Sequence, residues 1–152
     1  MTSNPNRPLP RPGEWDQGFW AAAADGRLVV QACEACNAVR NFPRMMCPKC
    51  GSMDIQWIES AGTGTVYTWT VLRREFHPDF SELPMLVAVV ALDDHPEVHL
   101  FCNLDTSPYG DVGPDDPKFD EAVYIGAPVE VTFETYNGFT MPQFRLKVAA
   151  HS

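Results

Sequence analysis

The sequence is poor in basic residues. It contains 11 Lys and Arg against 20 Asp and Glu, which gives a formal net charge of −9. Nucleic-acid-binding proteins usually carry a basic surface, because much of their affinity comes from neutralising phosphates. The composition therefore argues against nucleic acid as a partner, and the acidity also disfavours binding to anionic membranes.

Long apolar runs are missing as well. No segment approaches the roughly 18–20 apolar residues that a membrane-spanning helix needs, and residues 1–13 lack the apolar core of a secretion signal. Five cysteines, four of them in two C-x-x-C pairs, suit a reducing compartment and bound metal better than disulfides. We therefore expect a cytoplasmic protein without a membrane partner.

Catalytic signatures are also absent. The sequence has no Gly-rich phosphate-binding loop, no Ser/His/Asp signature and no pair of catalytic carboxylates. The acidic pairs at 93–94 and 115–116 are typical of solvated turns. We predict no catalytic residue in this chain, although a free-standing enzyme stays open as an alternative.

The chain is predicted to be mainly β and to divide into three regions. Residues 1–26 combine a proline-rich extended arm with a short helix at 14–25, residues 27–60 hold the cysteine pairs, and residues 61–152 are rich in strands. The strand candidates are 28–32, 55–58, 65–74, 85–92, 98–104, 129–135 and 143–148. The last five, with a hairpin turn at Asn137-Gly138, favour a small Greek-key barrel of the OB-fold type.

Four cysteines form the pattern C-x2-C-x10-C-x2-C, with the residues Cys33, Cys36, Cys47 and Cys50. Each pair forms a tight knuckle, and two knuckles place four thiolates around one ion with Zn–S distances of about 2.3 Å. Asn37 and Gly51 follow the two knuckles and tolerate the left-handed backbone needed there. The pattern predicts one zinc ion, with iron as the alternative metal.

A site closed by four cysteines has no open coordination position, so it cannot activate water and is expected to be structural. A redox C-x-x-C is the rival interpretation, which two pairs at this spacing disfavour. The fifth cysteine, Cys102, lies on an apolar strand and is expected to be buried and unreactive. His99, the nearest histidine in sequence, would point to the opposite face of that strand.

Several aromatic residues allow two interpretations. Trp15, Phe19 and Trp20 crowd the predicted helix, where they either cap a small core or bind another protein; we take them as candidate partner-binding residues. Tyr67 and Trp69 alternate on one predicted strand face and could stack bases on an OB barrel, although core or partner-facing positions are commoner. A single-stranded nucleic-acid-binding module is therefore the alternative function.

Two loops stand out. Residues 105–122 are predicted to be a long acidic loop, which is usually functional or disordered. The segment after strand 65–74 offers two cations, two aromatics and a histidine, with the residues Arg73, Arg74, Phe76, His77 and Phe80. These residues either form a solvated loop or line a pocket where an arginine meets phosphate and a phenylalanine lines an apolar slot.

In this order along the chain, the motifs resemble the DUF35 family. The matching segments are the aromatic helix, Gly26-Arg27-Leu28, the two cysteine pairs, Phe42-Pro43-Arg44, Gly62 to Tyr67, His77-Pro78-Asp79-Phe80 with Leu83-Pro84, strand 87–92 and Ile125 to Val129. Asn37 departs from the family, which usually has Gly there. Since Asn also tolerates a left-handed backbone, the knuckle should survive the difference.

The resemblance implies a rubredoxin-like zinc ribbon joined to a five-stranded OB-fold. It also implies a non-catalytic subunit that pairs with a thiolase-like enzyme, such as a thiolase or a steroid side-chain aldolase, or with a hydratase subunit. Such a subunit helps to hold an acyl-CoA as a shared ligand, and we place the candidate CoA contacts at residues 73–80. We expect a hetero-oligomer.

Overall fold

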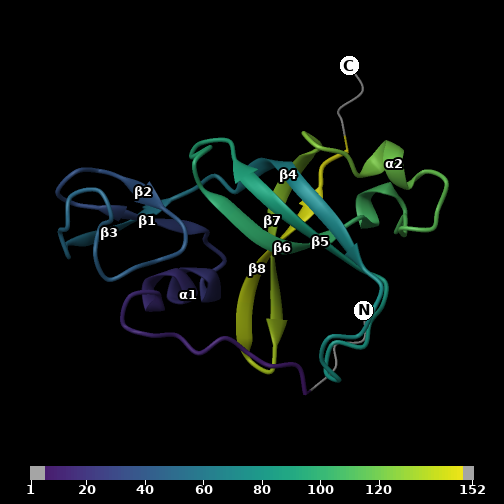
Figure 1. Cartoon of the computed structure of the whole chain (residues 1–152), viewed down its shortest axis with the longest axis horizontal. Coiled ribbons are helices and arrows are strands. Elements are labelled where there is room, and N and C mark those ends of the chain that lie inside the picture. Colours follow the sequence, from purple (N-terminus) through teal and green to yellow (C-terminus); the bar gives the residue numbers. More distant parts are fainter. Residues whose placement is uncertain (1–5, 149–152) are drawn as a thin grey trace.

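The structure, a computed structural model, describes residues 6–148. The ends of the predicted arm and barrel regions, residues 1–5 and 149–152, lie outside the described residues. A small three-stranded sheet and a closed five-stranded barrel lie side by side, with helix α1 (Gln17–Ala24) next to both (Figure 1). Within residues 6–148, no helix is long and apolar enough to cross a membrane.

Helix α1 begins three residues later than the predicted start at residue 14. Residues 14–16 form a turn instead, in which the Asp16 carboxylate accepts hydrogen bonds from the Gly13 N–H and from Trp20 Nε1. Gly18 lies against the ring of Trp57, because a Cβ at this position would be 2.2 Å from Trp57 Nε1. The small residue therefore lets α1 approach the ribbon sheet closely.

The ribbon sheet has the order β2-β1-β3, with β1 (Val29–Cys33), β2 (Val39–Arg40) and β3 (Ile55–Glu59), all antiparallel. All five residues of β1 are buried. A strand that is buried at every position has both faces covered, and here α1 packs on it. The sheet thus fixes the first cysteine at the end of a rigid central strand.

The barrel closes in the order β4-β5-β6-β8-β7 and confirms the predicted OB-like fold. Its strands are β4 (Thr63–Leu72), β5 (Met85–Leu92), β6 (His99–Asp105), β7 (Pro128–Tyr136) and β8 (Phe139–Leu146). Asn137 and Gly138 both have positive φ and form the predicted tight turn between β7 and β8. The parallel contact of β6 with β8, which pairs Leu104 with Phe144, closes the ring.

Burial alternates along β5 and β6 and so builds much of the barrel core. In β5 every second residue is buried, and the intervening residues face outward. The most deeply buried large side chains of the barrel are Val66, Val90, Leu92, Val98, Val129, Phe144 and Leu146. Burying an aliphatic or aromatic side chain of this size stabilises a fold by roughly 1.5–3 kcal/mol, so this cluster holds the barrel together.

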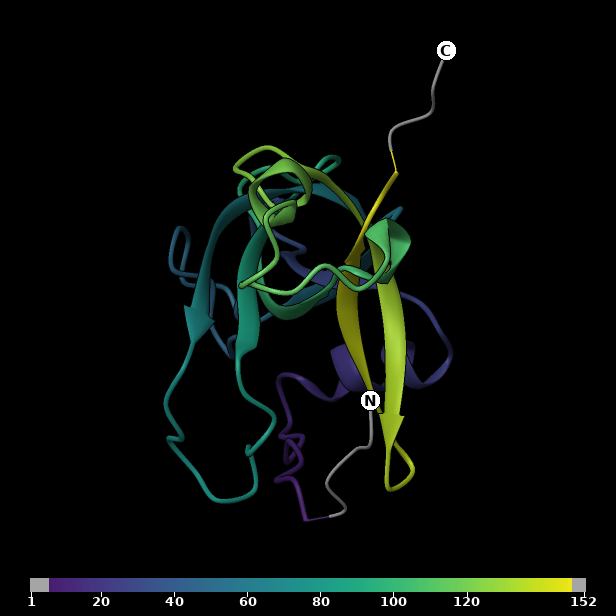
Figure 2. The ribbon, with the colours of Figure 1, turned by 90° about the vertical axis from the view of Figure 1, so that its right-hand side faces the viewer.

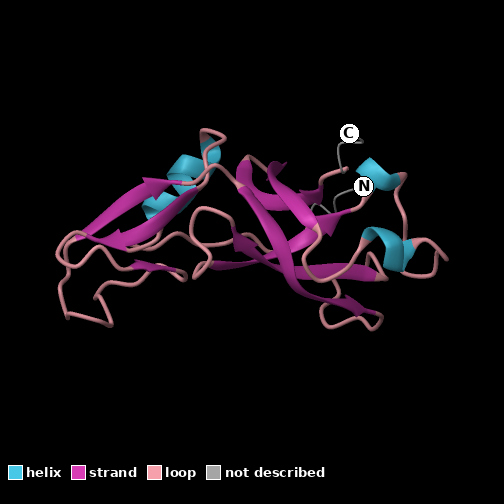
Figure 3. Cartoon of the chain, turned by 90° about the horizontal axis from the view of Figure 1, so that it is seen from above, coloured by secondary structure: helices cyan, strands magenta, loops and turns pink. Residues whose placement is uncertain are grey.

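The predicted loop 105–122 is more structured than expected. It contains the 3₁₀-helix η1 (Ser107–Tyr109) and the short helix α2 (Phe119–Ala122), which lie at the end of the barrel far from the ribbon (Figure 3). Val112 and Phe119 are buried in the core cluster. The sequence predicts a loop because acidic residues and prolines surround these few buried apolar residues and hide the short helices.

Strand β4 contains a β-bulge that overturns one prediction. The register against β5 shifts between Val66 and Thr68, and a bulge changes the side-chain alternation. Trp69 therefore packs toward the core, edge-on to Phe119 with 5.3 Å between ring centroids, whereas Tyr67 stays exposed. The predicted shared face of Tyr67 and Trp69 is wrong, and no base-stacking platform forms there.

Candidate functional site

The four ribbon cysteines converge on one point. Their Sγ atoms all lie within 4.8 Å of one another. The Sγ atoms of Cys33 and Cys50 are 3.6 Å apart, as are those of Cys36 and Cys47. A tetrahedral site with Zn–S distances of about 2.3 Å separates its sulfurs by about 3.8 Å, so the donor set fits a single tetrahedral metal ion such as zinc.

The two knuckles repeat one backbone geometry. In the first, Asn37 donates its N–H to the Cys33 carbonyl at 2.9 Å, and in the second, Gly51 donates to the Cys47 carbonyl at 2.9 Å. Asn37 has a φ of 59° and Gly51 a φ of 77°, which confirms the predicted left-handed positions. Asn37 therefore serves in the first knuckle as Gly51 does in the second.

Electrostatics also favour a cation among the sulfurs. Backbone hydrogen bonds from Cys50 and Lys49 lower the pKa of the Cys47 thiol to about 6. A backbone hydrogen bond from Ser52 lowers the pKa of Cys50, but the neighbouring sulfurs, Cys33 foremost, and burial outweigh it and raise that pKa to about 12. Thiolates this close repel one another, and a divalent cation removes that repulsion.

Bound there, the metal would cross-link the two knuckles and leave no open position for chemistry. Cys33 and Cys47 are buried, whereas Cys36 and Cys50 are exposed at the ribbon tip. The centre is therefore a structural cross-link at the periphery of the molecule. Cys102 is separate from it, since it is buried in the barrel, and burial raises its pKa to about 12. The prediction that Cys102 is buried is confirmed.

Gln31 is a structural residue that sequence reasoning missed. It is 1% exposed on β1, and its Oε1 accepts hydrogen bonds from Arg40 Nε at 2.6 Å and from the Arg44 N–H at 2.7 Å. Its Nε2 donates to the Trp15 carbonyl at 3.0 Å. One amide side chain thus joins β1, β2, the loop before Cys47 and the turn before α1.

The candidate partner-binding aromatics occupy different environments. Trp15 is 45% exposed, whereas Phe19 and Trp20 are half-buried. Phe19 packs against the core cluster, and the Trp20 ring contacts that of Phe139 of β8 at a tilt of 55°, with 5.2 Å between ring centroids. Phe19 and Trp20 join the helix to the barrel, so Trp15 is the most accessible of the three for another protein.

A different group of aromatic residues forms an exposed surface across the ribbon and the barrel. We call it the aromatic surface and define it by Phe42, Tyr67, His99 and Phe101. Phe42 of the ribbon stacks on Phe101 of β6 with 6.2 Å between centroids, and Tyr67 stacks on His99 at 4.3 Å. Asn41 Nδ2 donates to the His99 carbonyl at 2.6 Å and fixes the ribbon loop to β6.

This aromatic surface is largely exposed and contains no Asp, Glu, Lys or Arg. Phe42, Tyr67 and Phe101 are 59%, 55% and 65% exposed. Beside them, β5 presents Val87, Val89 and Ala91 on its outward positions. Sequence analysis missed the surface because Phe42 and Phe101 are 59 positions apart in the chain and meet only when the ribbon docks on the barrel.

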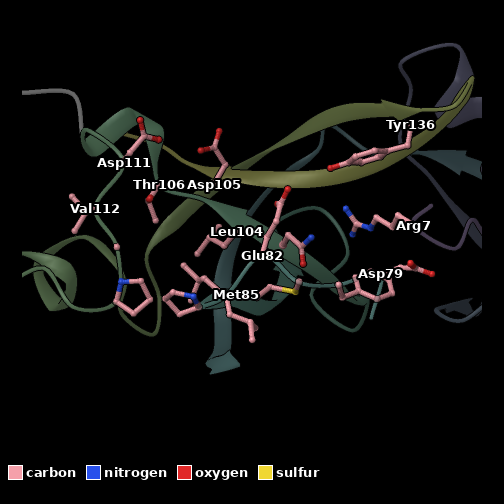
Figure 4. A pocket seen from close by; sticks show the side chains of 17 residues that line it. Arg7, Asp79, Glu82, Met85, Leu104, Asp105, Thr106, Asp111, Val112 and Tyr136 are labelled. Atoms are coloured by element: carbon pink, nitrogen blue, oxygen red, sulfur yellow. The ribbon is translucent and has the colours of Figure 1, made fainter. Parts of the chain in front are cut away.

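An open cavity of about 370 Å³ lies at one end of the barrel, between the β4–β5 connection, the C-terminal end of β6 and the acidic segment after it. Its apolar floor includes Met85, Leu104 and Val112, and Arg7 and Tyr136 lie at one end (Figure 4). Four carboxylates line it, those of Asp79, Glu82, Asp105 and Asp111. Such a mixed cavity can bind an amphipathic ligand.

The candidate CoA residues lie near this cavity, but only Phe80 lines it. Phe76 stacks on Phe80 with 5.1 Å between centroids, and the His77 ring is edge-on to Phe80 at 5.9 Å. Arg73 pairs with Asp115 at 2.9 Å, and each group shifts the other's pKa, raising that of Arg73 and lowering that of Asp115. The five residues therefore form one loop beside the cavity, and their CoA contact stays a prediction.

Comparison with known proteins agrees with this architecture. Residues 20–55 match the rubredoxin-like zinc ribbon domain of ChsH2, and residues 57–134 match the C-terminal OB-fold domain of ChsH2. A probable enoyl-CoA hydratase alpha subunit of Thermomonospora curvata is 39% identical over 139 residues, 90% of this chain. A DUF35 domain-containing scaffold protein of Pyrococcus furiosus is 37% identical over 73 residues, 47% of this chain. The chain spans 39% and 52% of the lengths of these two curated relatives.

Solved structures of related proteins share this fold. A chain of the Ltp2-ChsH2(DUF35) aldolase superposes with a TM-score of 0.74 and 35% identity, covering 92% of this chain and all of that one. A DUF35 protein of unknown function from Sulfolobus solfataricus has a TM-score of 0.56 at 14% identity, covering 89% of this chain and 87% of that chain, which supports the fold alone. The chain therefore belongs to the DUF35 family, as a member with the zinc ribbon and C-terminal OB-fold of ChsH2.

Proposed function

We propose that this chain is the non-catalytic subunit of an acyl-CoA-processing complex. A thiolase-fold partner, of the thiolase or steroid side-chain aldolase type, would supply the residues for carbon–carbon bond cleavage or formation. The names of the relatives support a subunit role, since one is an aldolase of two named components, one a hydratase subunit and one a scaffold protein.

The aromatic surface is the observation that carries this proposal. Protein–protein interfaces are enriched in aromatic residues and depleted in charge at their centres, and exposed apolar patches mark interaction sites. Phe42, Tyr67 and Phe101 have these properties on a chain whose net charge is −9. The ribbon would then have a clear role, because its metal-stiffened fold holds Phe42 against Phe101.

We place the acyl-CoA beside the 73–80 loop rather than deep in the cavity. Four carboxylates and one arginine line the cavity, a balance that repels the phosphates of CoA. Arg73 is already paired with Asp115, whereas Arg74 forms no ion pair with the residues that the structure describes. Arg74 is therefore the stronger candidate for a phosphate contact, with the stacked Phe76 and Phe80 beside it.

The docking claim is tested with the Phe101→Asp variant and the purified partner subunit. A charge at the centre of an apolar interface should weaken binding and raise the dissociation constant at least about tenfold, as measured by calorimetry. Ile125→Asp is the matched control, because Ile125 is 72% exposed but outside the aromatic surface. If both variants bind as the wild type does, the partner docks elsewhere.

The CoA claim is tested separately in the assembled complex. Arg74→Ala should raise the Michaelis constant for the acyl-CoA with little change in kcat, because a phosphate contact remote from the reacting bond binds substrate and transition state alike. Arg73→Ala should do less, since Asp115 already neutralises it. An unchanged Michaelis constant in the double variant would remove both arginines from the site.

A further inference from the structure

The barrel-end cavity already contains a cation from its own chain. Residues 6–13 run between the β4–β5 connection and the β7–β8 hairpin (Figure 2). The guanidinium carbon of Arg7 lies 5.2 Å from the Phe80 ring centroid and 4.8 Å from that of Tyr136. Arg7, Phe80 and Tyr136 are all half-buried. Residues 6–13 are therefore held against the barrel by the Arg7 side chain, which lies between the two rings.

This seat has the chemistry of a guanidinium site. A planar cation is attracted to the faces of aromatic rings within about 6 Å of the centroid, and a partly desolvated contact is stronger than an exposed one. Asp79 lies beside Arg7 at this end of the cavity, Glu82 lies nearer its middle, and both add negative potential (Figure 4). Two rings and nearby carboxylates therefore select arginine over a neutral or anionic group.

The cavity is larger than its present occupant. With Arg7 in place, about 370 Å³ stays open toward Met85, Leu104 and Val112. Arg7 is the only cationic side chain among the lining residues of the described chain, against four carboxylates. The open part thus offers an apolar floor next to the guanidinium seat, in a lining where carboxylates outnumber cations.

We infer that this cavity is a binding site for an arginine-bearing extended segment of a partner protein, and that Arg7 fills its guanidinium seat only in the free chain. A partner's arginine would replace Arg7 between Phe80 and Tyr136, and the apolar neighbours of that arginine would occupy the open floor. The inference concerns a surface apart from the aromatic surface, and it does not depend on the partner being a thiolase.

The test uses two peptides that differ in one atom group. Acetyl-Leu-Arg-Leu-amide carries the cation, and its citrulline counterpart has nearly the same shape without the charge. Binding is followed by the NMR shifts of the Phe80 and Tyr136 amides in the metal-loaded wild type, in Arg7→Ala and in Arg11→Ala. Arg11 is the matched control, since it is an exposed arm arginine that does not line the cavity.

The arginine peptide should bind Arg7→Ala at least about tenfold more tightly than it binds the wild type, because a tethered Arg7 competes at an effective concentration on the order of millimolar. The citrulline peptide should bind Arg7→Ala at least about tenfold more weakly than the arginine peptide does. Arg11→Ala should match the wild type. Adding Glu82→Gln to Arg7→Ala should weaken the binding of the arginine peptide, and added salt should weaken that binding further.

Three results would overturn the inference: equal binding of the two peptides, equal binding of the arginine peptide to wild type and Arg7→Ala, or shifts that map away from Phe80 and Tyr136. An amide spectrum of Arg7→Ala that matches the wild type outside the arm shows that the variant is folded. Loss of partner binding by Phe101→Asp has no bearing on these outcomes, so the two proposals fail separately.

Discussion

Arg40 Nε donates a hydrogen bond of 2.6 Å to Gln31 Oε1 across strands β1 and β2, inside the ribbon. A buried polar pair is stable only when its groups are satisfied. Gln31 is satisfied by Arg40, Arg44 and Trp15, whereas Arg40 Nη1 has no hydrogen-bond partner among residues 6–148. The ribbon therefore depends on this pair as well as on its metal.

Gln31→Ala should lower the free energy of unfolding of the metal-loaded protein by about 1–3 kcal/mol, because it leaves the buried Arg40 Nε and the partly buried Arg44 N–H without an acceptor. Urea unfolding followed by fluorescence measures the change. Gln56→Ala is the control, since Gln56 makes only hydrogen bonds of 3.4–3.5 Å and is half-buried. Equal losses of stability in the two variants would show that Gln31 contributes no more to the fold than Gln56 does.

Gly18→Ala should destabilise the protein although it lies in a helix. Replacing Gly by Ala in an open helix gains about 1 kcal/mol, but here the new Cβ would lie 2.2 Å from Trp57 Nε1. Overpacking costs about 1–3 kcal/mol and should outweigh the helical gain. Gly113→Ala, where a Cβ meets open space, is the control. Thermal unfolding shows whether the substitution lowers or raises stability. A higher melting temperature for Gly18→Ala would contradict the packing of α1 on β3.

Removal of the metal should unfold the ribbon and leave the barrel folded. Outside β1 the ribbon buries few side chains, whereas most members of the apolar core cluster belong to the barrel. Chelation should therefore abolish the NMR dispersion of residues 27–60 while the β5 and β6 signals persist. Cys36→Ser should lower the zinc content measured by mass spectrometry, and Cys102→Ala should leave it at one ion per chain. A ribbon that keeps its dispersion without metal would refute the structural role.

Cys102 should resist alkylation in the folded protein. Burial raises its pKa to about 12 from an ordinary value of 9.0, so its thiolate fraction at pH 8 falls by roughly a thousandfold. Since the folded pKa exceeds the unfolded one, this group's contribution to stability is present below pH 9 and declines as the pH rises toward 12. Iodoacetamide with peptide mapping checks the first point, and fast labelling at pH 8 without denaturant would contradict it.

Local signals predicted much of this structure. The cysteine spacing, the Asn137-Gly138 turn and the apolar run at 85–92 each predict a local structure within a few residues, and the cysteine cluster, the turn and strand β5 are confirmed. Helix α1 begins late because Asp16 accepts the N–H of Gly13 and ties the preceding residues into a turn.

Features that depend on distant segments escaped prediction. The bulge that separates Tyr67 from Trp69 arises from pairing with β5, and the stacking of Phe42 on Phe101 requires the ribbon to dock on β6. Neither leaves a periodic trace in the sequence. The placement of Arg7 between Phe80 and Tyr136 likewise joins three segments far apart in the chain.

The central claim, that this chain works as a subunit beside a thiolase-fold enzyme, is tested most directly by affinity purification of the tagged chain from native extract with mass spectrometry of the co-purifying chains. We expect a thiolase-fold subunit at a fixed stoichiometry that survives high salt, because the aromatic surface is apolar, and we expect Phe101→Asp to lose it. A chain that purifies alone, or with RNA or ribosomal proteins resistant to high salt, would contradict the account.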